Sequence, residues 1–421
     1  MPEHEKTELS ELALRFIRYA GIDTASDGSS DTSPSTAVQM DFLMMLRDEL
    51  IGMGMEGVEL DPAGTLYAGL PGGGSGETVV GLLAHVDTSP EAPGRGVSPR
   101  VHRNWDGGPI VLEGGTVIDP SDTERMSDYV GGTIITSDGT TLLGADDKAG
   151  VAVIMEACRI LMEDPGIPRP PVRVAFTTDE EIGRGMDGFD TSKFGAELAY
   201  TVDGGPVGKV DTQTFNACSA VFAIKGREVH PGSAKGQMVN AVRIASDLVS
   251  TLMHEEMPEN SQGTEGYTYP MSISGTTGEA ALRLILRDFT EEGMKRRLEY
   301  LDALREFMVL RYPVAGIDLK TSRQYSNPAE VLKKDPRAVE YAMRGTMEAG
   351  IRPQETAIRG GTDGSRLSFM GVPTVNLPTG GELFHSRREW VAEEGLEQSL
   401  ATLMATLRTW GVEQRRSSGP I

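Results

Sequence analysis

Cysteine is scarce in this sequence of 421 residues, which contains only Cys158 and Cys218. Two cysteines exclude a disulfide framework and any cysteine-rich zinc module. Cys158 falls within an apolar helical pattern, so we expect it in the core. Histidine is also rare, with six residues in the chain. Any metal bound here must therefore be held by histidine and carboxylate side chains.

Basic residues are few relative to acidic ones. The chain has 62 Asp and Glu against 40 Lys and Arg, which gives a formal net charge of −22. Such a charge repels a phosphate backbone and tolerates metals or cationic ligands. No apolar run approaches the roughly 20 residues that span a bilayer, and the first residues lack the basic and apolar regions of a signal peptide. We therefore expect a cytoplasmic protein that binds neither nucleic acid nor membrane.

Hydrophobic patterning in the first half of the chain indicates helices alternating with short apolar strands. The expected helices are 8–20, 36–50 and 148–162, and the expected strands are 79–84, 172–177 and 199–203. This order predicts βαβ crossovers and an α/β fold, with a mostly parallel sheet covered by helices on both faces. Trp105 and residues 119–128 have the composition of ordinary surface loop.

After about residue 216 the order changes to strand, helix, strand, strand, helix and strand, the ferredoxin-like unit. Its elements are expected at 219–225, 237–253, 267–274, 279–287, 290–310 and 317–325. Motifs like those of the first half resume near Arg359, so this unit is an insertion. We predict a discontinuous main domain, 1–215 and 327–421, interrupted by a ferredoxin-like α+β domain at 216–326.

Histidine and acidic residues stand where the apolar strands end or where a helix begins after them. These residues are His85, Asp87, Asp146, Asp147, Glu180, Glu181, Asp203 and His385. The carboxyl ends of strands in an open parallel sheet face one crevice, so we expect these side chains to converge. Each has an ordinary alternative: a packed histidine, a turn aspartate or a solvated acidic loop. Several such coincidences among a handful of strand ends favour a common site.

The side chains present match the needs of two divalent cations. One histidine, one terminal carboxylate, one shared carboxylate and a water or hydroxide complete a four-coordinate Zn²⁺. Two such sites that share an aspartate lie about 3.5–4 Å apart. Two histidines and three carboxylates fill both sites. Mn²⁺ or Co²⁺ would also bind such a site.

This assignment leaves Asp87 and one member of the Glu180–Glu181 pair without a metal to bind. Asp87 lies two residues from His85, on the same face of a strand, where it can accept the imidazole N–H. The spare glutamate can hold a metal-bound water and accept its proton.

Seven segments together resemble a known family. They are His85–Thr88, Gly144–Gly150, Asp179–Gly183, Thr201–Gly205, Gly226–Gly232, Arg359–Gly364 and Thr379–Gly381. Over essentially the full chain they resemble the peptidase T family, the tripeptide aminopeptidases among the co-catalytic dinuclear zinc peptidases. The main local divergence is Glu382-Leu383-Phe384, which would alter the shape of the pocket.

The resemblance implies a role for each residue of the set. It places on one zinc ion His85, Asp146 and Asp203, and on the other Asp146, Glu181 and His385. Glu180 is then the general base that forms a dizinc-bridged hydroxide, and Asp87 orients and polarises His85. Asp147 either contacts the ligands or is an ordinary acid at a helix N-terminus. Lys148 is expected to be solvent-exposed or a structural partner.

Three further residues are candidates for binding the substrate: His230, Arg287 and Arg359. The resemblance implies that His230 contacts the scissile carbonyl, often from a partner subunit, although a histidine in a surface turn is the ordinary reading. Arginine suits the terminal carboxylate of a peptide because it binds carboxylates in a bidentate manner. Arg359 is the better candidate, since it lies in a glycine-rich loop near His385, whereas Arg287 has Asp288 as a partner.

The sequence thus predicts a hydrolase, a metal-dependent aminopeptidase with two Zn²⁺ per subunit that removes the N-terminal residue from short peptides, with tripeptides as the expected substrates. The resemblance also implies that the inserted domain is a lid and forms a homodimer. An alternative keeps the metal site and changes the substrate to an N-acyl amino acid or a dipeptide, because the scissile amide is chemically the same. A non-catalytic metal-binding or peptide-binding protein is disfavoured, since the acid–base set is complete.

Overall fold

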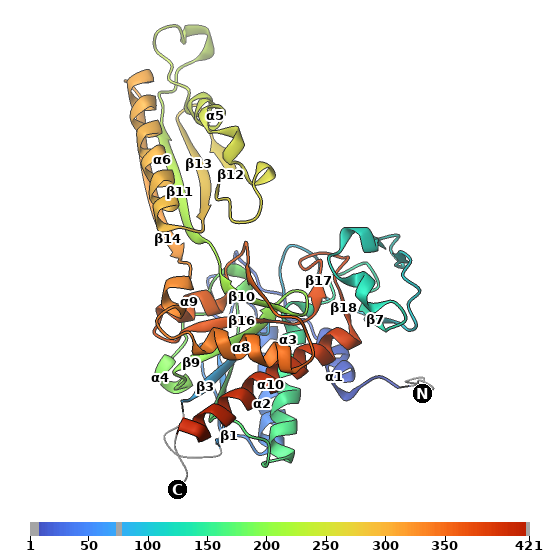
Figure 1. Ribbon diagram of the computed structural model, residues 1–421. Coiled ribbons are helices and arrows are strands. Elements are labelled where there is room, and N and C mark those ends of the chain that lie inside the picture. The colour runs from blue at the N-terminus through green and yellow to red at the C-terminus, as the bar shows by residue number, and fades with distance from the viewer. Residues whose placement is uncertain (1–7, 73–77, 418–421) are drawn as a thin grey trace. The chain divides into compact units, whose positions relative to one another are not determined.

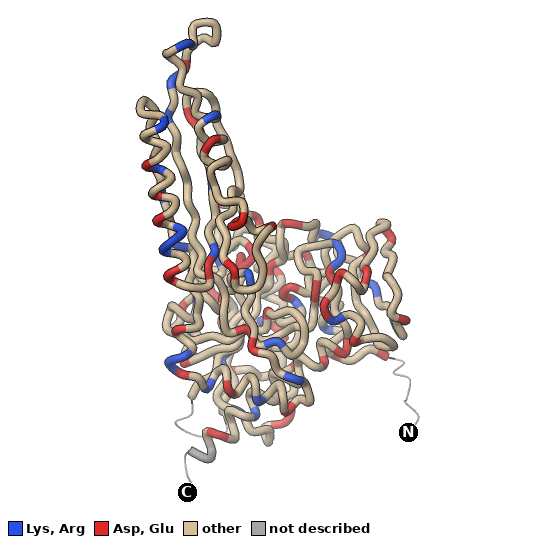
Figure 2. The backbone as a smooth tube through the Cα atoms, turned by 45° about the horizontal axis from the view of Figure 1, so that its top comes forward, with Lys and Arg blue, Asp and Glu red and all other residues tan. Residues whose placement is uncertain are grey.

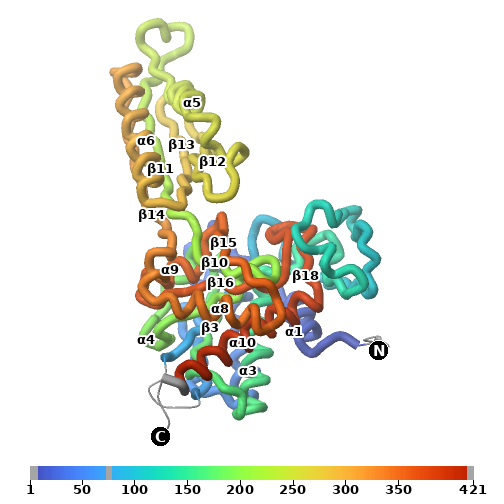
Figure 3. Tube along the Cα trace, viewed as in Figure 1, coloured from blue at the N-terminus to red at the C-terminus, as the bar shows by residue number. Residues whose placement is uncertain are grey.

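The computed structural model describes residues 8–72 and 78–417, which form two units (Figure 1). Unit 1 consists of Met1–Thr212, Glu330–Thr356 and Thr362–Ile421, and unit 2 consists of Gln213–Ala329 and Ala357–Gly361. Unit 1 therefore combines an N-terminal part of the chain, which begins in blue in Figure 3, with a C-terminal part drawn in orange and red.

Unit 1 is built around a large mixed sheet, which has eight strands within the described residues. In spatial order they are β1 (Glu56–Leu60), β2 (Leu66–Leu70), β8 (Val172–Thr177), β3 (Val80–His85), β9 (Leu198–Gly204), β16 (Thr374–Pro378), β10 (Lys209–Gln213) and β15 (Gln354–Ala357). The central strands β8, β3, β9 and β16 run parallel to one another. Their carboxyl ends therefore share one edge of the sheet, where ligands bind in folds of this kind.

Helices cover both faces of this sheet (Figure 1). One face carries α1 (Glu11–Ala20), α2 (Val38–Met53), α3 (Ala145–Glu163), α7 (Ala329–Leu332), α8 (Arg337–Glu348) and α10 (Glu393–Ser417), and the other carries α4 (Thr191–Phe194) and α9 (Asp363–Phe369). Successive side chains of a strand point to opposite faces. Accordingly Leu82 belongs to the first core and Leu83 packs with Phe194 and Leu367 in the second. The predicted sheet covered on both faces is confirmed.

A smaller sheet in unit 1 supports the loop that contains His385. Its strands, in spatial order, are β17 (Gly381–Glu382), β18 (Trp390–Ala392), β7 (Ile134–Thr136) and β4 (Arg100–His102). The chain between β4 and β7 forms β5 (Ile110–Val111), β6 (Val117–Ile118), η1 (Pro120–Asp122) and η2 (Met126–Tyr129). The expectation of a surface loop is wrong for Trp105, which is 5% exposed and packs with Ile118 and Trp390. Apolar residues scattered between short turns have no period that would predict this core.

Unit 2 contains an antiparallel sheet covered on one face by two helices. The strands, in spatial order, are β12 (Tyr267–Gly275), β13 (Glu279–Asp288), β11 (Asn216–Lys225) and β14 (Gly316–Tyr325), and the helices are α5 (Ala241–Thr251), α6 (Glu291–Arg311) and the short η4 (Pro231–Ser233), η5 (His254–Glu256) and η6 (Pro258–Asn260). The first strand in the chain lies between the third and the fourth, so the ferredoxin-like prediction is confirmed. Figure 2 shows charges of both signs along α6. Among the helices that the structure describes, none is both long and apolar enough to cross a bilayer.

Candidate active site

The structure brings five of the predicted ligands together in unit 1, next to the carboxyl ends of the parallel strands. They are His85 at the end of β3, Asp146 in the first turn of α3, Glu181 in η3 (Glu180–Ile182) after β8, Asp203 near the end of β9, and His385 between β17 and β18. Ligand atoms of His85, Asp146 and Glu181 all lie within 4.8 Å of one another.

Asp146 lies between the two histidines. Its Oδ1 is 3.0 Å from Nε2 of His85, and its Oδ2 is 3.2 Å from Nε2 of His385. The Nε2 atom of each imidazole also faces one further carboxylate. Oδ1 of Asp203 lies 3.6 Å from Nε2 of His85, and Oε2 of Glu181 lies 2.9 Å from Nε2 of His385. Each side therefore has one histidine, one private carboxylate and one oxygen of the shared Asp146.

Asp147 is a second neighbour of His85, and its carboxylate also falls within 4.8 Å of ligand atoms of His85 and Asp203. It is fully buried, and one oxygen accepts a hydrogen bond from the backbone N–H of His85, at 3.2 Å. Asp147 thus supports the backbone of strand β3. Asp146, which contacts both imidazoles, fits the shared position better.

Asp87 contacts His85 on the other side of the imidazole ring. Nδ1 of His85 lies 3.0 Å from the backbone oxygen of Asp87 and 3.4 Å from its Oδ1. A proton on Nδ1 directed at these oxygens leaves the lone pair on Nε2, the nitrogen that faces Asp146 and Asp203. The Asp87 carboxylate also accepts hydrogen bonds from the backbone N–H groups of Glu180 and Glu181, at 3.0 and 3.2 Å.

Asp179, which precedes the two glutamates, faces a different part of unit 1. Its backbone is left-handed, with φ 62°, and its carboxylate accepts hydrogen bonds from the N–H and Oγ of Ser35 and from Nε2 of Gln39. The backbone N–H of Asp179 in turn donates to Oε1 of Gln39. These bonds fix the turn from which Glu180 and Glu181 project, and they give Asp179 different partners from Glu181, whose carboxylate faces His385.

Burial and mutual charge shift the acid–base equilibria of the cluster. Burial raises the pKa of Glu181 to about 8, with a contribution from the charge of Asp146, and raises that of Asp203 to about 6. Burial also raises the pKa of Glu180 well above its ordinary value. For His385, burial lowers the pKa, but hydrogen bonds to Asp146 and Glu181 outweigh it and raise the pKa to about 11. Without a cation, the His385 imidazole and the neighbouring Glu181 therefore favour their protonated forms.

The donor set fits two divalent cations. Oε1 of Glu181 is buried and, within the described part of the chain, has no hydrogen-bond partner. An unpaired carboxylate oxygen in such a place is costly, and a cation would remove the cost. Two imidazole nitrogens and three carboxylates form a mixed N/O set that suits Zn²⁺, Mn²⁺ or Co²⁺.

Two buried carboxylates near the cluster were missed by the sequence reasoning. Asp363 is 4% exposed, its Oδ2 accepts a hydrogen bond from Oγ1 of Thr177, and burial raises its pKa to about 7. It lies in the glycine-rich motif that begins at Arg359, which was the available signal. Glu389, which is 1% exposed, follows His385 in the same loop, and no local pattern indicated it.

Lys148 is a structural residue rather than a solvent-exposed one. Its side chain is fully buried, and its Nζ donates a hydrogen bond to the backbone oxygen of Ile22 and lies over the ring of Phe42. Burial lowers its pKa to about 8. It therefore joins the start of α3 to the segment after α1.

The three candidates for substrate binding all lie in unit 2. His230 is exposed at the start of η4, and its Nδ1 accepts a hydrogen bond from the N–H of Gly232. Arg359 is half-buried, and its guanidinium donates to the backbone oxygens of Gly263 and Glu265 and to Oγ of Ser261.

The predicted pairing of Arg287 with Asp288 is wrong. Arg287 donates to Oε1 of Gln324, and Asp288 pairs with Arg297 at 3.0 Å. Neighbouring side chains of a strand point to opposite faces, so residues 287 and 288 of β13 cannot pair with each other.

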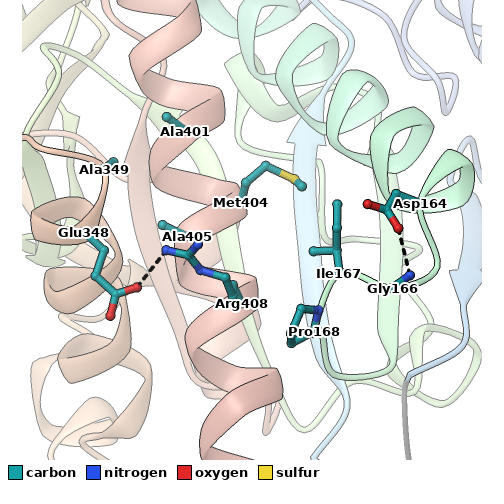
Figure 4. Close-up of a pocket in the computed structure, with 10 residues that line it drawn as sticks. All are labelled: Asp164, Gly166, Ile167, Pro168, Glu348, Ala349, Ala401, Met404, Ala405 and Arg408. Atoms are coloured by element: carbon teal, nitrogen blue, oxygen red, sulfur yellow. Dashed lines mark hydrogen bonds and ion pairs between the residues drawn. The ribbon is translucent and has the colours of Figure 1, made fainter.

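A groove elsewhere in unit 1 has a different character. Figure 4 shows its lining between α8, α10 and the segment that follows α3, with apolar side chains such as Ile167 and Met404 and an ion pair between Arg408 and Glu348 at its side. None of the candidate residues lines this groove. The candidate site is therefore the His–carboxylate cluster.

Comparisons with known proteins identify the family of the chain. Residues 138–409 match peptidase family M20/M25/M40. Peptidase T of Geobacillus kaustophilus is 43% identical over 410 residues, which cover 97% of this chain and 99% of that protein. Peptidase T of Clostridium perfringens is 40% identical over 397 residues, which cover 94% and 98%.

Solved structures show the same fold. The aminopeptidase PepT of Bacillus cereus matches with a TM-score of 0.74 at 22% identity, and a tripeptidase of Staphylococcus aureus with 0.76 at 20%; each match covers 96% of this chain and 99% of the other. A dinuclear metal-binding peptidase of Bacillus subtilis matches with a TM-score of 0.66 at 15% identity, over 96% and 98%. The chain therefore belongs to peptidase family M20/M25/M40, among its peptidase T members.

Proposed function

We propose that this hydrolase is a tripeptide aminopeptidase with two metal ions, one held by His85, Asp146 and Asp203 and the other by Asp146, Glu181 and His385. The observation that carries the assignment is Asp146, whose two oxygens each face a different histidine at 3.0 and 3.2 Å. Membership of the peptidase family supports the reaction class, and relatives named peptidase T support the peptide substrate.

Glu180 is the proposed general base. Glu180 directly precedes the proposed ligand Glu181 in the chain, and its carboxylate is not needed as a ligand. Burial raises the pKa of Glu180 well above its ordinary value. A carboxylate positioned beside a water can accept its proton and return it to the leaving amine. When bound, the metal ions supply Lewis-acid chemistry, since they polarise the scissile carbonyl and acidify water.

Asp87 is the proposed positioning residue for both His85 and Glu180. Its Oδ1 faces Nδ1 of His85, and its two carboxylate oxygens accept hydrogen bonds from the backbone N–H groups of Glu180 and Glu181. It thereby orients the ligand and the base together, and effective proton transfer depends on such geometry.

For substrate binding we propose His230 as a donor to the scissile carbonyl and Arg359, with Arg287 second, as partners of the peptide carboxylate. The exposure of the His230 imidazole supports its assignment. An arginine provides the bidentate geometry that a carboxylate needs.

Zn²⁺ is the proposed metal, because a mixed N/O set of three protein ligands and a water per ion suits it. We also propose a homodimer formed through the inserted domain. The edge strand β12 supports this, since Tyr269, Met271 and Ile273 are 40%, 56% and 44% exposed, and such edges pair with other chains. Two free cysteines suit a reducing compartment such as the cytoplasm.

The test is a matched panel of substrates, run together with metal analysis of the purified protein. Trialanine, dialanine and tetra-alanine would be compared with their N-acetylated forms. We expect two metal ions per chain and fastest release of alanine from trialanine. Cleavage confined to N-acylated substrates would replace this proposal with a deacylase, since the same metal site hydrolyses either amide.

A further inference from the structure

The segments that contain Asp146 and His385 both have irregular backbone. Leu383 and His385 have φ values of 57° and 58°, a region that residues with a Cβ rarely adopt. Asp146 has φ −85° and ψ 107°, which is not helical although the residue belongs to the first turn of α3. The left-handed conformations of Leu383 and His385 persist only where neighbouring groups hold them.

One buried side chain connects these two segments. Oε2 of Glu389 accepts hydrogen bonds from the backbone N–H groups of Leu143 and Gly144, both at 2.8 Å. Its Oε1 accepts one from the backbone N–H of Asp146, at 2.9 Å. Glu389 is 1% exposed, so water does not compete for these bonds. Three backbone N–H donors of one segment therefore meet the two oxygens of this one side chain.

Glu389 is also held relative to His385. In the His385 loop, which we define as Leu383–Glu389, Oγ of Ser386 donates to the backbone oxygen of Leu383 and the N–H of Glu389 donates to the backbone oxygen of Ser386. The next residue, Trp390, begins β18 and pairs with Thr136 of β7. The carboxylate of Glu389 therefore links the His385 loop to the start of α3 by hydrogen bonds.

We propose that Glu389 is a positioning residue of the metal centre, which sets the separation of the Asp146 carboxylate from the His385 imidazole. The inference rests on the proposed function, because it needs these two residues as ligands. Glu389 does not itself contact the metals or the substrate in this role. It acts through the backbone of Leu143–Asp146. Its removal should change the distance between Oδ2 of Asp146 and Nε2 of His385, which is 3.2 Å in this structure.

The variant that tests this is Glu389→Gln, which keeps the volume and replaces one acceptor oxygen by an NH₂ group that faces a backbone N–H. The matched control is Glu393→Gln. Glu393 is also buried, at 3% exposure, and accepts a hydrogen bond from the backbone N–H of Ser10, at 2.7 Å. The segment around Ser10 contains no proposed ligand. Both variants are made in the full-length chain.

Three measurements are compared with the unmodified protein: Co²⁺ affinity by chelator competition, the visible absorption of bound Co²⁺, and the unfolding temperature of the metal-free protein. Loss of an outer hydrogen-bond partner of a ligand weakens metal binding about 10–100-fold. We expect Glu389→Gln to weaken Co²⁺ binding by that factor and to alter the absorption spectrum. Glu393→Gln should change neither, whatever it does to the unfolding temperature.

Unchanged Co²⁺ affinity and an unchanged spectrum in Glu389→Gln would overturn the inference, even if the metal-free protein became less stable. If Glu389→Gln does not fold, Glu389→Asp replaces it, because it keeps the charge but loses reach by one methylene; wild-type affinity there would overturn the inference equally. Failure of the proposed function is distinguishable, because it would show in the unmodified protein, either as no Co²⁺ pair bound or as no release of alanine from trialanine, whatever the Glu389 variants do.

Discussion

The carboxylate of Asp87 accepts a hydrogen bond from the backbone N–H of Glu180, at 3.0 Å. The other oxygen accepts from Glu181, and Oδ1 also lies 3.4 Å from Nδ1 of His85. One buried side chain thus connects the proposed base to a proposed ligand on the neighbouring strand. Displacing Asp87 would therefore change two functional groups at once.

Asp87→Asn tests this connection. Asparagine keeps the size but presents an NH₂ group to one of the two backbone N–H donors, so the turn that contains Glu180 should shift. We expect kcat for trialanine to fall about 10–100-fold. Asp61→Asn is the control, because Asp61 is also buried and accepts a backbone hydrogen bond, from Thr65, outside the cluster. Equal losses in the two variants would contradict a specific role for Asp87.

Glu180→Gln should keep both metals and lose turnover. Removal of the proton acceptor typically costs about 10²–10⁴-fold in rate. The comparison is Glu181→Gln, which should instead lose metal, because it removes the carboxylate that faces His385 at 2.9 Å. Metal content by inductively coupled plasma analysis and kcat separate the two roles. Near-normal turnover in Glu180→Gln would refute its assignment as the base.

Asp146→Ala should abolish the binding of both metals, since the shared carboxylate contacts both imidazoles. The unfolding temperature of the unmodified protein should rise when Zn²⁺ is added, because a ligand that binds only the native state stabilises it. The variant should show no such rise. A variant that still binds two ions would show that another carboxylate, such as Asp147, is the shared ligand.

Gly150→Ala should destabilise the fold next to the site. A Cβ at this position of α3 would lie 1.8 Å from the backbone oxygen of Val202 and 2.4 Å from Oδ1 of Asp147. Forcing atoms into a packed core costs about 1–3 kcal/mol of unfolding free energy. The control is Gly52→Ala in α2, where nothing lies within 4 Å of the added carbon. There the change should stabilise the helix by about 0.5–1 kcal/mol. Urea denaturation measures both, and equal effects would contradict the close packing of α3 on β9.

The metal-free protein should become less stable as pH rises from 6.5 to 8. Burial raises the pKa of Glu181 from 4.5 to about 8, so the native state keeps a proton that the unfolded state releases. The carboxylates beside His385 outweigh its burial and raise its pKa from 6.5 to about 11, with the same consequence. Where the native state binds more protons, the free energy of unfolding falls with rising pH. Unfolding temperatures in chelator test this, and His385→Gln should flatten the slope.

Local patterns were sufficient to predict the fold and the family. Continuous apolar runs such as Val79–Ala84 predict buried strands, and the residues that follow them lie at one sheet edge for purely topological reasons. This is why His85 and Asp203 could be expected near each other before any coordinates. The ferredoxin-like order of unit 2 followed in the same way from the sequence of its elements.

The sequence by itself therefore determined the sheet, the insertion and the kinds of candidate metal ligand present. Tertiary structure alone decided which groups contact the adjacent acids 179–181. Asp179 accepts hydrogen bonds from Ser35 and Gln39, whereas the backbone N–H groups of Glu180 and Glu181 donate to Asp87. It also decided that Glu389 contacts the start of α3, more than 240 residues away in the chain. Side-chain contacts of this kind depend on where distant segments pack, and no local period records that arrangement.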